Sequence, residues 1–138
     1  GNSLSSARVS DVNVVIDHKL YWCATSSVAE SRYLVAILNS ETLLRRVRPF
    51  QNLGLFGPRD FDKNVWMVPV PPYDPRNADH IAVASLSAEA EAIAERVDLS
   101  AATSFQAKRK LVRKELDACG QAAKIEAAVD LVIPPTES

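Results

Sequence analysis

The sequence predicts an α+β fold, with a few short strands in its N-terminal and central parts and a set of about three helices toward its C-terminus. Two patterns predict this fold class. Short runs of β-branched apolar residues occur before residue 75, and apolar residues recur at helical spacing after residue 78. Because 47% of the 138 residues are hydrophobic and 24% are charged, we expect a globular structure with a buried core.

The first element expected is a hairpin or an edge pair of strands. Val12 to Ile16 form a β-branched run, and Lys19 to Ala24 form a second short extended segment. Asp17 and His18 between them suit a tight turn.

A pair of helices is expected next. Tyr33 and Ile37 lie four residues apart, as do Leu34 and Leu38, and this spacing predicts a helix from about residue 28. Ser40 can cap a second, short helix that ends before Pro49. This second helix should turn three apolar residues inward and carry three cations near its C-terminal end: Leu43, Leu44 and Val47, and Arg45, Arg46 and Arg48.

The central region is expected to form a loop, a strand and a turn. Glycine and proline residues indicate an exposed loop over 51–64, and Val65 to Val70 have the composition of a strand. Pro71 and Pro72 would end that strand, since proline cannot continue a ladder of hydrogen bonds. Residues 74–77 have the composition of a turn.

Three helices are predicted at about residues 79–97, 104–118 and 121–132, with Asp79 and Ser104 as caps of the first two. Each of these segments carries an apolar stripe, which a helix buries on one face. The stripes comprise Val83, Leu86, Ala90, Ile93 and Val97, then Leu111, Val112 and Leu116, and finally Ile125, Ala128, Val129 and Val132.

The net charge of −1 argues against nucleic-acid binding through overall charge alone. There is no long apolar run and no signal pattern, so we expect a cytoplasmic location. Cys23 and Cys119 lack the spacing of zinc ligands, and we expect them to be reduced, partly buried thiols.

No motif predicts catalysis. Pro71-Pro72-Tyr73 matches part of an amino-methyltransferase motif, but Val70 stands where a polar side chain would hold the target amine. We interpret the triplet as a strand end. His18 and His80 lack the local sequence of a catalytic triad, and we expect His80 to be a surface or capping residue where a helix opens. No catalytic residue and no metal site are therefore predicted.

One basic group predicts a DNA contact. Arginine suits phosphates and guanine edges, and glutamine and asparagine can read adenine edges. The alternative is a solvated helix face beside a flexible loop. A second basic group, within residues 108–114, is interpreted as the solvated face of its helix. The residues of the first group are Arg45, Arg46, Arg48, Gln51, Asn52, Arg59 and Lys63.

In order and spacing, several segments resemble the end of the target-recognition region in adenine-N6 DNA methyltransferases of restriction-modification type. Tyr33 to Ser40 resemble a helix that ends in Leu-Asn-Ser, and a glycine-rich segment follows at Gly54 to Pro58. Arg59 to Lys63 match an Arg-Asp-apolar-x-Lys element of the family. A strand ending in a proline-rich turn, an Asp-Pro turn, a histidine and an alanine-rich helix then follow over residues 65–97. Pro58 departs from the family, which more usually has a small or polar residue there.

The resemblance implies that residues 1–75 are the end of a target-recognition region, and that 76–138 are a helical part packed with it as one unit. The chain would be a non-catalytic C-terminal fragment that recognises double-stranded DNA, with Arg59 and Lys63 near the duplex. It would hold no cofactor itself, because S-adenosylmethionine would bind in the catalytic methyltransferase domain of the parent chain. The alternative function is a structural or protein-interaction module, whose helices at 79–132 dock on the parent enzyme or a partner subunit.

Overall fold

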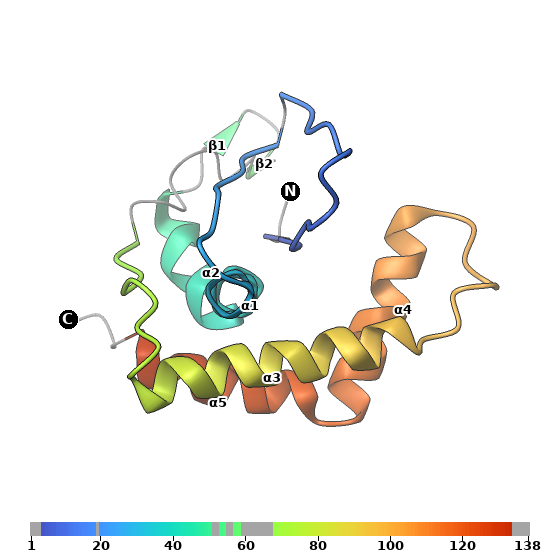
Figure 1. The fold of residues 1–138 in the computed structure, drawn as a ribbon. Helices are drawn as coiled ribbons and strands as arrows, with labels where there is room; N and C mark the ends of the chain where they lie inside the picture. The colour runs from blue at the N-terminus through green and yellow to red at the C-terminus, as the bar shows by residue number, and fades with distance from the viewer. Residues whose placement is uncertain (1–3, 19, 51–52, 55–56, 59–67, 134–138) are drawn as a thin grey trace.

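The computed structural model describes residues 4–18, 20–50, 53–54, 57–58 and 68–133. Helices dominate these residues (Figure 1). Their elements, in chain order, are α1 (Val28–Leu38), α2 (Glu41–Val47), the 3-10 turn η1 (Arg48–Phe50), β1 (Leu53–Gly54), β2 (Gly57–Pro58), α3 (Ala78–Glu95), α4 (Phe105–Ala118) and α5 (Gln121–Val132).

The expectation of an α+β fold is wrong. Within the described ranges the strand pairing is a single antiparallel contact of two residues on each side, with Leu53 opposite Pro58 and Gly54 opposite Gly57. Residues 12–16, 20–24 and 68–70 are irregular. A strand requires a neighbouring strand for its hydrogen bonds, and β-branched composition alone does not supply one.

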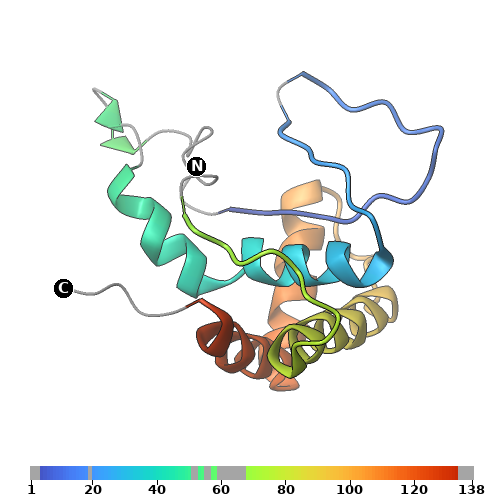
Figure 2. The same cartoon turned by 60° about the vertical axis from the view of Figure 1, so that its left-hand side comes forward.

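The N-terminal segment shows most clearly why the expected strands do not form. The turn expected at Asp17 is present, since the amide of Leu20 donates to the Asp17 carbonyl oxygen at 3.0 Å. The segments on either side of this turn nevertheless arch away from the helices (Figure 2). Val12 and Val15 are each 93% exposed, so neither residue has a surface to pack on.

The central apolar run, Val65 to Val70, differs from the N-terminal segment because its described valines pack in the core. Val65 lies outside the described residues, whereas Val68 is buried in the core and Val70 packs against it. Both do so from an irregular segment. The expected strand is therefore wrong for residues 68–70, the part of this run that the structure describes.

The individual helices follow their sequence signals. Ser40 caps α2 by accepting from the Leu43 amide at 3.1 Å, and Ser104 caps α4 by accepting from the Ala107 amide at 3.1 Å. The expected cap at Asp79 is wrong, because α3 begins at Ala78 and Asn77 caps it instead. The Asn77 side-chain oxygen accepts from the amide of Asp79 at 2.9 Å.

The core lies where α3 packs against α1 and α5, with α2 against the end of α5 (Figures 1 and 2). Its fully buried side chains are apolar and come from segments far apart in the sequence. They are Tyr33, Ile37, Leu43, Val47, Val83, Val129 and Ile133. None of the described helices is long and apolar enough to cross a membrane.

Candidate nucleic-acid interface

The predicted basic group begins on α2, which is held at its N-terminal end. The Glu126 carboxylate of α5 accepts from the Glu41 amide at 2.6 Å, and the Thr42 hydroxyl donates to the Asp130 carboxylate of the same helix at 2.5 Å. A carboxylate at this end also suits the positive pole of the helix. These contacts, together with the buried side chains of Leu43 and Val47, fix which face of α2 is exposed.

The exposed face carries the arginines. Arg45 and Arg48 are exposed and Arg46 is half-buried. Arg45 donates to the Glu41 carbonyl oxygen and to the Thr42 hydroxyl, at 3.4 Å each. Neither Arg45 nor Arg48 forms an ion pair with a carboxylate of the described residues. The two guanidinium groups can therefore meet an anionic ligand without first breaking such a pair.

The other predicted contact residues lie outside the described ranges. They are Gln51, Asn52, Arg59 and Lys63. The structure thus brings together the three arginines near the end of α2 and says nothing of the loop residues that the sequence groups with them.

The Pro-Pro-Tyr triplet is part of the packed structure. The hydroxyl of Tyr33 donates to the Pro71 carbonyl oxygen at 2.8 Å, and the rings of Tyr33 and Tyr73 lie 5.3 Å apart between centroids. The carbonyl that would hold a target amine in a methyltransferase motif therefore accepts a hydrogen bond from a side chain of the core.

His80 is also part of this cluster, and the expectation of a surface or capping residue is wrong. Its ring is buried, 4.9 Å between centroids from that of Tyr33. Its Nδ1 accepts from the Asp74 amide at 3.0 Å, so the proton of a neutral ring lies on Nε2. No local pattern indicates this burial, because Tyr33 lies on a different helix.

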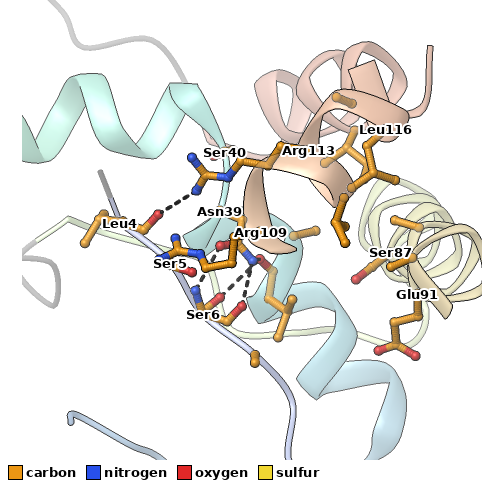
Figure 3. A pocket seen from close by; sticks show the side chains of 18 of the residues that line it. Leu4, Ser5, Ser6, Asn39, Ser40, Ser87, Glu91, Arg109, Arg113 and Leu116 are labelled. Carbon is orange, nitrogen blue, oxygen red and sulfur yellow. Dashed lines mark hydrogen bonds between the residues drawn. The ribbon is translucent and has the colours of Figure 1, made fainter. Parts of the chain in front are cut away.

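A half-open groove of about 740 Å³ lies between the N-terminal segment, α1, α3, α4 and α5. Figure 3 shows Leu4 to Ser6 on one side of it, with Arg109 and Arg113 of α4 nearby. Arg113 donates to the Leu4 carbonyl oxygen at 3.4 Å. Apolar residues of the groove include Val35, Ala90, Val112 and Ile125.

Two further contacts hold the N-terminal segment beside this groove. The Ser6 amide donates to the Asn39 side-chain oxygen at 2.9 Å, and Arg8 pairs with Glu91 of α3 at 3.2 Å. Glu91 also accepts from Arg32 of α1 at 3.0 Å. Partial burial raises the pKa of the Glu91 carboxyl, but the bonds from Arg32 and Arg8 lower it by more, so the net shift is downward.

The described residues contain no group of three His, Cys, Asp or Glu side chains that could hold a metal ion. Cys23 and Cys119 are free thiols, and both are exposed instead of partly buried as expected. Comparison of the chain with protein-family models, with curated proteins and with solved structures found no match.

Proposed function

We propose that this chain contributes to DNA target recognition as a non-catalytic C-terminal part of a site-specific adenine-N6 DNA methyltransferase. The parent chain would bind S-adenosylmethionine in its own catalytic domain and transfer the methyl group there. The resemblance of residues 30–132 to the end of the family's target-recognition region motivates the proposal.

The observation that supports it best is the exposed pair Arg45 and Arg48 at the end of α2. Arginine forks bind phosphate oxygens and guanine edges, and these two have no carboxylate partner among the described residues. In the sequence they precede the segment that contains Arg59 and Lys63, the other two cations that the resemblance implies for DNA contact.

A binding titration tests the proposal. Duplex DNA of random sequence is titrated with the full chain at several salt concentrations, starting at about 50 mM. Arg45→Ala and Arg48→Ala should each weaken binding and lower the dependence of log affinity on log salt by about one, if each contacts one phosphate. If either reads a base, its loss should cost about 1–3 kcal/mol on the preferred sequence.

The matched control is Lys124→Ala, which removes an exposed cation from α5. It should leave affinity and salt dependence unchanged. If the wild-type chain fails to bind duplex DNA at low salt, or if all three variants bind alike, the proposal is wrong. Hydrogen exchange gives a second readout, because bound DNA should protect residues 45–63 and leave α5 unchanged.

A second candidate function, a module that docks on the parent enzyme or a partner subunit, has its own supporting observation. The N-terminal segment exposes several large apolar side chains to solvent, and exposed apolar surface can serve as a site where another protein docks. Its most exposed members are Val12, Val15, Leu20, Tyr21 and Trp22.

Hydrogen-exchange measurements distinguish the two candidate functions. Addition of the parent catalytic domain should protect residues 9–24 if this segment docks on it, and Val15→Ser with Trp22→Ser should remove that protection. Because both side chains are exposed, the double substitution should change the stability of the chain by less than about 0.5 kcal/mol. If the catalytic domain protects none of these residues, docking through this segment is excluded.

A further inference from the structure

The outer part of α4 carries an unusual concentration of positive charge. Of the ten residues 105–114, five are Lys or Arg and none is Asp or Glu. Four of these cations lie in two pairs spaced four residues apart, which places each pair along one side of the helix. We call them the basic stripe of α4: Arg109, Lys110, Arg113 and Lys114.

The stripe is accessible. Helix α4 buries none of its residues completely, and Lys110, Arg113 and Lys114 are exposed. No carboxylate of the described residues pairs with the stripe. The guanidinium of Arg109 lies 5.6 Å from the centre of the Phe105 ring, and Arg113 donates to the Leu4 carbonyl oxygen. Both contacts orient a cation without neutralising it.

A solvated helix face does not account for this pattern well. Such faces usually mix charges, because an acidic and a basic residue four apart stabilise a helix by about 0.2–0.5 kcal/mol while like charges destabilise it by a similar amount. Both pairs of the stripe are like-charged. The first turn of α4 also lacks an acidic residue that would complement the helix dipole. Asp117, four residues after Arg113, offsets part of this repulsion, and an anionic ligand on the stripe would offset the remainder.

The placement of α4 fits the proposed DNA contact. Figures 1 and 2 both show α2 and the first turns of α4 on the same side of α3. Duplex DNA carries one charge per about 1.7 Å of its axis, and cations four residues apart are separated by about 6 Å along the helix. A duplex that contacts the stripe would therefore present several phosphates to it.

We propose that the basic stripe of α4 is a second DNA contact, which binds phosphates of the duplex without reading its sequence. This inference rests on the proposed DNA function, and it assigns to α4 the positioning of a duplex whose bases are read elsewhere. Contacts to phosphate fix orientation, and base contacts supply specificity.

The test compares two double variants of the full chain that lose the same charge. Lys110→Gln with Lys114→Gln removes two exposed cations of the stripe, and glutamine preserves helix propensity. Arg76→Gln with Lys124→Gln removes two exposed cations outside α4. Circular dichroism establishes that both are folded, and each is titrated with duplex DNA of random sequence over a range of salt.

The stripe variant should reduce the slope of log affinity against log salt by about two and weaken binding roughly tenfold per lysine at about 0.1 M salt. The loss should be the same on every duplex sequence, and the control variant should bind like the wild type. The inference is overturned if the stripe variant keeps the wild-type slope of log affinity against log salt. It is also overturned if the control variant loses as much affinity for DNA as the stripe variant. A loss of heparin binding without a loss on duplex DNA also overturns it.

These outcomes are distinct from failure of the proposed function. Absence of DNA binding by the wild-type chain at low salt contradicts the function and, with it, the role of α4. Binding that depends on Arg45 and Arg48 but not on Lys110 and Lys114 leaves the function in place and removes only the role of α4.

Discussion

The hydroxyl of Tyr33 donates a hydrogen bond to the carbonyl oxygen of Pro71, 2.8 Å away, and so joins α1 to the irregular segment that precedes α3. The Tyr33 side chain is fully buried, and its ring also contacts His80 on α3. This bond therefore lies where three segments that are distant in sequence meet. The junction sets how the segment after residue 67 enters the helical core.

Substitution of Tyr33 by Phe should destabilise the chain by about 1–3 kcal/mol. The phenylalanine ring preserves the apolar packing, but the Pro71 carbonyl loses its donor at a partly buried position. Urea unfolding measures the difference. The control is Tyr73→Phe, because Tyr73 is half-buried and its hydroxyl has no hydrogen-bond partner among the described residues. If Tyr73→Phe lowers the free energy of unfolding as much as Tyr33→Phe does, the role assigned to the hydrogen bond between Tyr33 and Pro71 is contradicted.

Stability should also fall at alkaline pH because of Tyr33. Burial raises the pKa of its phenol to about 12, from an ordinary value of about 10. Between these values the unfolded chain releases the proton while the folded chain keeps it. The contribution is therefore complete below pH 10 and is lost as the pH rises toward 12, by about 2–3 kcal/mol in total. The unfolding free energy of the wild type should decline more steeply than that of Tyr33→Phe, and parallel curves would contradict the assignment.

The sequence predicted those features of the fold that depend on local interactions. Ser40 and Ser104 cap their helices as expected, because a cap bonds to an amide three residues away and needs nothing else from the fold. The helix over residues 121–132 likewise follows from its own periodicity and lies at those bounds in the structure.

The sequence could not predict features that depend on contacts between residues far apart in the chain. The run around Val15 has strand composition, but whether a neighbouring strand exists is a property of the whole fold. Burial of His80 depends on Tyr33, and the environment of Glu91 depends on Arg8 and Arg32. Of the candidate interface, composition could identify the arginines of α2, whereas their exposure follows from the packing of α2 against α5.

The two serine caps should differ in strength. Ser40 is buried and also donates to the Ile37 carbonyl oxygen at 2.7 Å, whereas Ser104 is exposed. Ser40→Ala leaves two buried backbone groups without this partner, so it should cost about 2 kcal/mol or more. Ser104→Ala should cost about 0.5–1 kcal/mol, because water can replace the lost bond. Urea unfolding of the two variants measures both values, and equal losses would mean that burial of the cap does not matter.

The carboxylate of Glu91 joins α3 to the N-terminal segment and to α1. Its Oε1 accepts from Arg8, and its Oε2 accepts from Nε and Nη2 of Arg32 at 3.1 and 3.0 Å. Only 28% of its side chain is exposed, and that of Arg8 is 25% exposed. Glu91→Gln leaves both arginines without a charged partner and should cost about 1–2 kcal/mol at neutral pH.

The effect of this substitution should depend on pH in a defined direction. Partial burial raises the pKa of Glu91, and the two arginines lower it by more, to a net value below the ordinary 4.5. As the pH falls, the unfolded chain therefore takes up this proton before the folded chain does. The contribution is present above pH 4.5 and is lost as the pH falls through the lower pKa of the folded chain. The gap in unfolding free energy between the wild type and Glu91→Gln should shrink in that window. Glu95→Gln, an exposed position one turn later on α3, should show no such gap, and a constant gap for Glu91→Gln would contradict the proposed ion pairs.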